Sequence, residues 1–305
     1  MTSARQRHEG LLFLLFVCYY PSGLEFYPAF SFLCEVLRLG KVIVCGKGGS
    51  GKSTVTALLA RYLVVSGRSV CVIDADESNT CLYRMVDLPH PGRTLAEELG
   101  GRPAIVKNCS SVCFDETNFP QKLHVKDLPC SCTSCRDNLY LVSIGKIKEM
   151  GEGCSCVMTD LAKQFISMLY AGSWTYLIDT GSSMEHIGRS LYDVCDAFLM
   201  VIDGTWESLE LAVKMKEFAE RLNKKIYWVL NKVKDSNLTF MAKALEERGL
   251  KPQGVVPYIS LFEEAALRGN PLPLQKEVIR NIESLASALA FGSQLESAFI
   301  TSCMK

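Results

Sequence analysis

The sequence lacks an excess of charge of either sign, and it lacks a long apolar run. Its 305 residues carry 33 basic and 33 acidic side chains, for a formal net charge of zero. Dedicated nucleic-acid-binding domains are usually strongly basic, so this balance argues against such a partner. The longest apolar run near the N-terminus, residues 11–20, is shorter than the roughly 20 residues that a membrane helix needs. We therefore expect no nucleic acid and no membrane as partners, and a cytoplasmic location.

Proline and glycine are not enriched, and no segment repeats, which excludes fibrous and low-complexity classes. The first 37 residues nevertheless differ from the rest. Basic residues precede the apolar run and imitate a signal peptide, but no small-residue cleavage site follows. We interpret residues 1–37 as an atypical extension, translated from upstream of a start near Val36 or Leu37. A membrane-associating extension is the alternative.

From residue 40 onward, short apolar runs alternate with amphipathic helical patterns. Strands are predicted at Lys41–Cys45, Val70–Ile73, Leu139–Ile144, Tyr176–Ile178, Ala197–Ile202, Lys225–Leu230 and Gly254–Pro257, and helices near 156–170, 207–222, 239–248 and 275–290. This alternation predicts a single α/β domain over residues 38–290, with a doubly wound, mostly parallel sheet flanked by helices. The proline- and cysteine-containing stretch 80–138 reads as an irregular insertion or lid, and residues 291–305 as a tail.

A glycine-rich loop follows the first predicted strand and opens a helix. It satisfies the pattern G-x-x-x-x-G-K-[ST], in which backbone N–H groups surround phosphate oxygens at a helix N-terminus. Lys52 is expected to reach the β- and γ-phosphates, and Ser53 to bind Mg²⁺. The predicted nucleotide-binding residues of this P-loop are Gly46, Lys47, Gly48, Gly49, Ser50, Gly51, Lys52, Ser53 and Thr54.

Acidic residues follow two later strands. Asp74 and Asp76 come after the strand at 70–73, where a carboxylate can orient the attacking water or support Mg²⁺. The segment resembles the first switch region of P-loop ATPases, which implies that Asp76 orients the water, and we assign the supporting role to Asp74. Asp179 ends the strand at 176–178 and is followed by Thr180 and Gly181. This segment resembles the Walker B motif and second switch of P-loop ATPases, which implies that Asp179 holds Mg²⁺ and that the N–H of Gly181 lies near the γ-phosphate.

The residues after the strand at 225–230 bear on the choice of base. A GTP reader of the Asn-Lys-x-Asp kind needs an acid at position 234, which is Lys234 here. ATP is therefore favoured, with Asn231 as the expected contact to the adenine edge.

The loop form G-K-G-G-x-G-K-[ST]-T resembles the deviant Walker A motif of the MinD/ParA, nitrogenase iron-protein and arsenite-pump ATPases. The resemblance implies a SIMIBI-like P-loop fold and an ATP-sandwiched homodimer, in which Lys47 crosses the interface to the partner's phosphates. It also implies ATP hydrolysis, with Lys47, Lys52, Asp76 and Asp179 as the catalytic set and ATP and Mg²⁺ as cofactors.

The positions of some of the 14 cysteines indicate which members of this family the chain resembles. The pattern Gly-x-Gly-Cys-x-Cys at 151–156 resembles the CooC-type ATPases that serve nickel insertion into carbon monoxide dehydrogenase. Two further segments resemble the same family: residues 94–101, and Asp179-Thr180-Gly181 followed by Glu185-His186. Two chains that each supply Cys154 and Cys156 would give the four ligands of a Ni²⁺ or Zn²⁺ site. The resemblance implies an ATP-dependent switch that delivers nickel to a carbon monoxide dehydrogenase-like client enzyme.

Several alternatives stay open at this point. The two thiols can be incidental, and Cys130, Cys132 and Cys135 can form a second metal-handling arm or a loop without a ligand. His186 can be a ligand or can hydrogen-bond within its own segment. Gly181 is followed by Ser-Ser-Met, which departs from the family's second switch. The rival functions are a ParA/MinD-type positioning switch without metal and a cluster-bearing, electron-donating ATPase.

Overall fold

The computed structural model describes residues 40–108, 122–147, 156–181 and 191–289, all of which belong to the unit Arg38–Lys305. Within this unit the strands form one eight-stranded sheet in the order β3-β4-β2-β5-β1-β6-β7-β8. All neighbouring strands are parallel except β3 and β4, which pair antiparallel. The strands are β1 Lys41–Gly46, β2 Ser69–Ala75, β3 Thr133–Arg136, β4 Leu139–Ser143, β5 Trp174–Thr180, β6 Ala197–Ile202, β7 Lys225–Val233 and β8 Gly254–Pro257.

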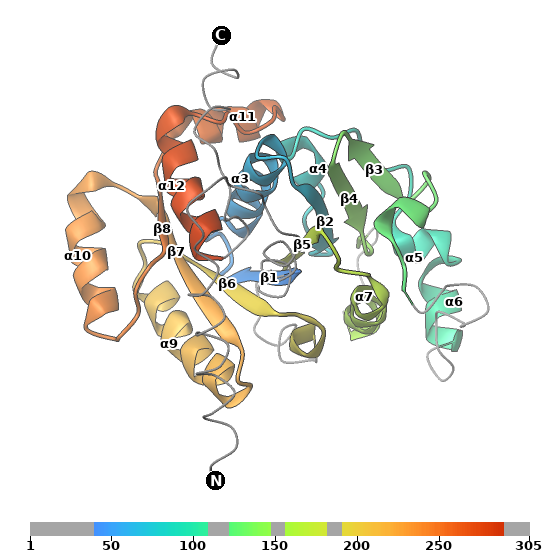
Figure 1. Ribbon diagram of the computed structural model, residues 1–305, viewed down its shortest axis with the longest axis horizontal. Helices are drawn as coiled ribbons and strands as arrows, with labels where there is room; N and C mark the ends of the chain where they lie inside the picture. Colours follow the sequence, from blue (N-terminus) through green and yellow to red (C-terminus); the bar gives the residue numbers. More distant parts are fainter. Residues whose placement is uncertain (1–39, 109–121, 148–155, 182–190, 290–305) are drawn as a thin grey trace, which may run out of the picture. The chain divides into compact units, whose positions relative to one another are not determined.

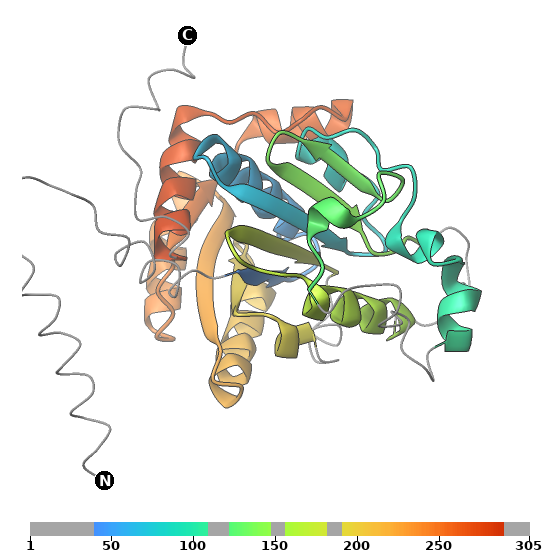
Figure 2. The same ribbon diagram turned by 45° about the vertical axis from the view of Figure 1, so that its right-hand side comes forward.

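Helices cover both faces of this sheet (Figure 1). They are α3 Lys52–Val65, α4 Leu82–Met85, α5 Leu95–Glu98, α6 Gly101–Asn108, α7 Cys156–Met168, α9 Trp206–Arg221, α10 Asp235–Glu246, α11 Ser260–Arg268 and α12 Lys276–Ala288, with short 3₁₀ turns at Val125–Asp127 and Leu191–Val194. Helices α3, α4, α11 and α12 pack on one face, and α7 and α9 on the other; Figure 2 shows α7 below the sheet and α12 beside it. The doubly wound α/β fold predicted from the sequence is confirmed.

The alternation of side chains along β1 shows why the core has two layers. Successive residues of a strand point to opposite faces. Val42 and Val44 accordingly contact the apolar cluster beneath α3 and α12, whereas Ile43 and Cys45 contact the cluster beneath α7 and α9. Cys45 is fully buried and is therefore a core residue, and this burial raises the pKa of its thiol to about 12. The central strands are buried on both sides, which explains their nearly unbroken apolar sequences.

The structure corrects three of the sequence-based expectations. The stretch 80–138 is not merely irregular, because its described part contributes α4, α5, α6 and the edge strand β3. Strand β7 continues to Val233, so Asn231 and Lys232 lie within the strand and not after it. A further helix, α11, follows β8. The predicted boundaries of the N-terminal extension and the C-terminal tail lie outside the described residues.

Candidate nucleotide site

The phosphate loop connects the carboxyl end of the central strand β1 to helix α3. Gly51 stands at the helix N-cap with φ +92° and ψ 32°, a left-handed conformation that favours glycine. A β-carbon at this position would lie 2.1 Å from Nδ2 of Asn231, so a side chain is excluded on two counts. Asn231 is buried in β7, and its Nδ2 donates a hydrogen bond of 2.7 Å to the Ser50 carbonyl. A residue of β7, 181 positions away in the sequence from Ser50, thus fixes the backbone of the loop.

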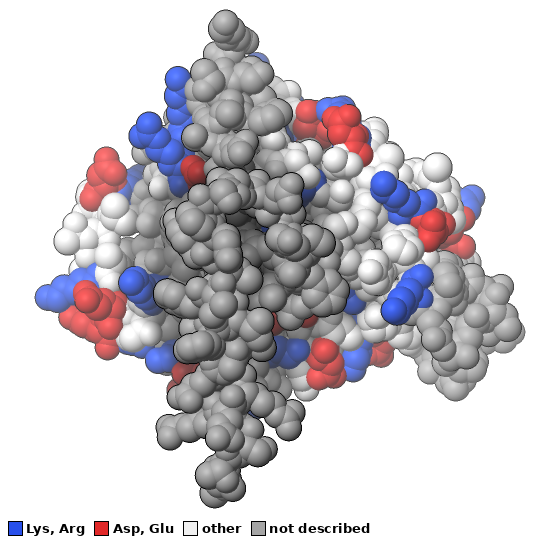
Figure 3. Space-filling view, in the orientation of Figure 1, with Lys and Arg blue, Asp and Glu red and all other residues white. Residues whose placement is uncertain are grey.

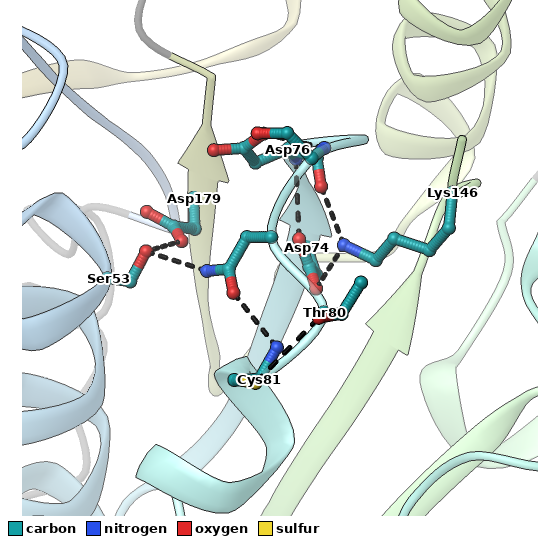
Figure 4. Close-up of polar contacts among 9 residues, drawn as sticks. Ser53, Asp74, Asp76, Thr80, Cys81, Lys146 and Asp179 are labelled. Carbon is teal, nitrogen blue, oxygen red and sulfur yellow. Dashed lines mark hydrogen bonds and ion pairs between the residues drawn. The ribbon is translucent and has the colours of Figure 1, made fainter. Parts of the chain in front are cut away.

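Strand register brings the two expected acidic positions beside this loop. In the sheet, β5 lies between β1 and β2, and Asp179 of β5 is in register with Val44 of β1 and Asp74 of β2. Because parallel strands end at the same edge, both residues lie at the edge of the sheet where α3 begins. The hydroxyl of Ser53 donates to Oδ2 of Asp179 at 2.6 Å, and the Asn79 amide donates to the Ser53 oxygen at 2.9 Å (Figure 4).

These oxygen ligands fit a magnesium ion. Asp179 is fully buried, and burial raises its pKa from 3.8 to about 7, although the Ser53 hydrogen bond acts in the opposite direction. A buried carboxylate beside a hydroxyl is a hard donor set that Mg²⁺ prefers. A cation at this point would favour the ionised carboxylate that burial disfavours. Thr56 also donates to Asp179, at 3.4 Å, so the carboxylate is fixed in orientation.

The segment after β2 is held by a lysine that the sequence reasoning did not single out. Nζ of Lys146 lies 2.6 Å from Oδ2 of Asp74 and 2.6 Å from the carbonyl oxygen of Asp76. Burial raises the pKa of Asp74 to about 6, while Lys146 favours its ionised form. The carboxylate of Asp76 accepts from the N–H and the hydroxyl of Ser78. Figure 4 shows Asp74 between Asp179 on one side and Lys146 on the other.

The two lysines of the loop occupy different surroundings. Lys52 is buried, and its Nζ donates to the Lys47 carbonyl at 3.3 Å. Nζ of Lys47 lies 3.6 Å from Asp203 and 3.7 Å from Glu207, both of the same chain. An interaction of Lys47 with a partner chain therefore requires that it leave these carboxylates. Sequence reasoning missed Asp203, whose position directly after β6 was the available signal.

The predicted base contact has a different environment from the one expected. The Asn231 amide is directed at the phosphate loop, and Nζ of its neighbour Lys232 donates to the Gly49 carbonyl at 2.8 Å. A contact between Asn231 and adenine stays a prediction. Gly181, directly after β5, is half-buried.

The predicted metal site is only partly visible. Cys156 is the first residue of α7, half-buried and disulfide-bonded, whereas Cys154 and His186 lie outside the described residues. Of the other cysteines, Cys132 is buried, and Cys130 and Cys135 are exposed. Among the residues that the structure describes, no group of three or more His, Cys, Asp or Glu side chains is arranged to hold a metal ion. Cys130, Cys132 and Cys135, all of which are described, are therefore not part of such a group, which favours the alternative of a cysteine-containing loop without a ligand.

The described surface has mixed charge. Figure 3 shows Lys and Arg interspersed with Asp and Glu across the described part of one face. Within the described ranges, no helix is both long enough and apolar enough to cross a bilayer.

Comparisons with known proteins agree with this geometry. An uncharacterized ATP-binding protein of Methanocaldococcus jannaschii is 33% identical over 245 residues, which cover 79% of this chain and 97% of that protein. The carbon monoxide dehydrogenase accessory protein CooC of Rhodospirillum rubrum is 26% identical over 75% of this chain and 88% of its own. The cytosolic Fe-S cluster assembly factor cfd1 of Aspergillus clavatus is 32% identical over 48% of this chain and 43% of its own.

Solved structures show the same fold. The cell division ATPase MinD of Pyrococcus furiosus superposes with a TM-score of 0.57 at 18% identity, over 82% of this chain and all of that one. MinD of Pyrococcus horikoshii, solved with Mg-ADP, gives 0.57 at 17% identity over 81% and 94%. The family model described as the CobQ/CobB/MinD/ParA nucleotide binding domain matches residues 41–272, which include the phosphate loop, Asp74 and Asp179. The chain therefore belongs to the CobQ/CobB/MinD/ParA family of nucleotide-binding domains.

Proposed function

We propose that this protein is an ATP-dependent dimeric switch that hydrolyses ATP to drive nickel delivery during the maturation of a carbon monoxide dehydrogenase-type enzyme. The observation that carries the nucleotide part is the bonded set of Ser53 and Asp179 at the start of α3, beneath a glycine loop with a buried lysine. Binding of a triphosphate with Mg²⁺ is the chemistry that such a set performs.

Each residue of the site has a separate role in the proposed hydrolysis. Backbone N–H groups of residues 47–53 surround the phosphates, and Lys52 contributes a positive charge from a buried position. Ser53 and Asp179 would hold Mg²⁺, and the ion would supply positive charge against the charge that develops on the phosphate oxygens. Asp76 orients water after its carboxylate leaves Ser78. Lys47 leaves Asp203 and Glu207 and binds the phosphates of the second chain.

The metal part of the proposal rests on Cys154 and Cys156 and on the similarity to CooC. A tetrahedral site for a soft ion needs four ligands, and two chains with two thiolates each supply that number. Cys156 begins α7, where the helix N-terminus stabilises a thiolate. Its disulfide must be reduced before it can bind a metal ion. In this account the ATP state of the dimer decides whether the two thiol pairs share an ion or release it.

The similarity to Fe-S cluster assembly factors favours a second candidate, in which the same thiols carry an iron–sulfur cluster. Anaerobically purified protein would then contain iron and absorb visible light. A protein with a nickel or zinc thiolate site would contain no iron. The positioning switch without metal, the other rival, predicts no metal of either kind.

The nucleotide part is tested by hydrolysis and light scattering. Wild-type protein should release phosphate and form a dimer with ATP, and Lys52→Ala should abolish hydrolysis. Lys47→Ala should bind ATP as a monomer, because the contact across the interface is lost. Lys243→Ala, at an exposed lysine of α10, is the matched control and should behave as wild type. Hydrolysis that survives Lys52→Ala would contradict the mechanism.

A further inference from the structure

The residues after β4 run alongside the end of β2 and the turn that follows it, and they contact both. The N–H of Ile144 donates to the Asp74 carbonyl at 2.9 Å, and that of Ile147 donates to the Glu77 carbonyl at 3.2 Å. Between them, the ammonium of Lys146 binds the Asp74 carboxylate and the Asp76 carbonyl, at 2.6 Å each (Figure 4). Lys146 thus adds a side-chain contact between two backbone hydrogen bonds, those of Ile144 and Ile147.

The arrangement of Asp76 shows what this ammonium does. The backbone N–H of Asp76 donates to Oδ1 of Asp74 at 3.3 Å, and the carboxylate of Asp76 accepts from the N–H and hydroxyl of Ser78 in the same turn. Both of these contacts are local in sequence. The Lys146 contact comes from 70 residues away and fixes the turn relative to the sheet.

We infer that Lys146 is a positioning residue for ATP hydrolysis, because its ammonium holds Asp74 and the Asp76 backbone in the geometry from which Asp76 reaches the attacking water. The inference rests on the proposed hydrolysis. Of the two acceptors of Lys146, Asp74 lies at the end of β2 and Asp76 directly after it, and neither belongs to the phosphate loop. The loss of Lys146 should therefore lower turnover and not nucleotide affinity. Misplacement of a reacting group by about 1 Å costs on the order of 100-fold in rate.

The surroundings of Lys146 make substitution feasible. Lys146 and Asp74 line a cavity of about 250 Å³ together with Thr80, Tyr83 and Thr94. Water from this cavity can solvate Asp74 when the ammonium is removed, so the fold should survive. Lys163, whose ion pair with Asp193 lies on the surface of α7 at 2.9 Å, provides a control that removes an ion pair elsewhere.

The test compares wild type with Lys146→Met, Lys146→Arg and Lys163→Met. Three quantities are measured: affinity for a fluorescent ATP analogue, kcat and KM for hydrolysis, and amide hydrogen exchange of residues 74–79 without nucleotide. We expect Lys146→Met to lower kcat roughly 10- to 100-fold, to leave affinity and KM within about threefold, and to speed exchange of this peptide. Lys146→Arg should recover most of both properties, and Lys163→Met should change neither.

The outcomes separate this role from the proposed function. Unchanged exchange in Lys146→Met would overturn the anchoring, and faster exchange with wild-type kcat would overturn the positioning role. A loss of ATP affinity as large as the loss of kcat would make Lys146 a binding residue and overturn the inference. Absence of hydrolysis in wild-type protein would instead overturn the proposed function, while the exchange data still report whether Lys146 anchors the segment.

Discussion

Replacement of Asp179 by Asn should make the nucleotide-free protein more stable at alkaline pH. Asp179 is fully buried, and its two oxygens accept hydrogen bonds from Ser53 and Thr56 but have no lysine or arginine within ion-pair distance among the described residues. Burial without a cation disfavours the charged form. The carboxylate therefore costs stability in the absence of Mg²⁺, and the neutral amide removes that cost while it keeps the shape of the side chain.

The sign and size of the effect follow from the pKa. In the folded protein the pKa of Asp179 is about 7, against an ordinary value of 3.8. Between these values the unfolded chain has already lost the proton that the folded chain retains, so the free energy of unfolding falls as pH rises. At about 1.36 kcal/mol for each pKa unit, the whole shift corresponds to on the order of 4 kcal/mol, most of which develops between pH 5 and pH 8.

Urea unfolding at pH 5 and pH 8, in the presence of EDTA, measures this difference. The stability of Asp179→Asn relative to wild type should rise by about 2–3 kcal/mol between the two pH values. Asp193→Asn, at an exposed carboxylate, should show no such trend. Mg²⁺ with nucleotide should stabilise wild type and not the variant. A difference between variant and wild type that is equal at both pH values would refute the assignment of a buried, charge-disfavoured carboxylate.

Three further substitutions test the packing of the loop and of its neighbours. Gly51→Ala should destabilise the protein by about 1–3 kcal/mol through its left-handed backbone alone, and further through the overlap with Asn231; urea unfolding and ATP-analogue affinity measure both effects. Asn231→Ala leaves the Ser50 carbonyl without its donor and should cost about 1–3 kcal/mol. In that background Gly51→Ala should cost less than in wild type, and strict additivity would contradict the contact. Thr94→Ala breaks the capping box with Glu97 at the start of α5 and should cost about 1 kcal/mol, whereas an unchanged unfolding midpoint would contradict the capping role.

The phosphate loop could be predicted from the sequence because its motif stands between an apolar strand, β1, and a helix, α3. The doubly wound sheet could be predicted for the same reason, since strands buried on both faces have unbroken apolar sequences. Asp179 accepts a hydrogen bond from Ser53 directly after the loop, and Asp74 is in register with Asp179 on the neighbouring strand, because parallel strands end at one edge of the sheet. Their roles in nucleotide binding stay predictions. The sequence indicates only that both residues lie near strand ends, and the observed register shows that they lie opposite each other on neighbouring strands.

Other features carry no local signal. Strand β3, Thr133–Arg136, is short and polar, and it pairs only at the sheet edge, so apolar alternation does not mark it. Lys146 lies 72 residues from Asp74, and a single lysine after a strand has no motif. The direction of the Asn231 side chain depends on how far β7 extends, which propensity alone does not define. These positions are determined by tertiary contacts between distant segments.

Nickel delivery as proposed requires that the thiol pairs of two chains together bind one metal ion under nucleotide control. Anaerobic, reduced protein is titrated with Ni²⁺ and Zn²⁺, with and without ATP, and bound metal is measured together with mass in solution. We predict one ion per dimer, with an affinity that changes with nucleotide and is lost in Cys154→Ala/Cys156→Ala. No tight binding, or binding unchanged in that variant, would contradict it and would favour the positioning switch.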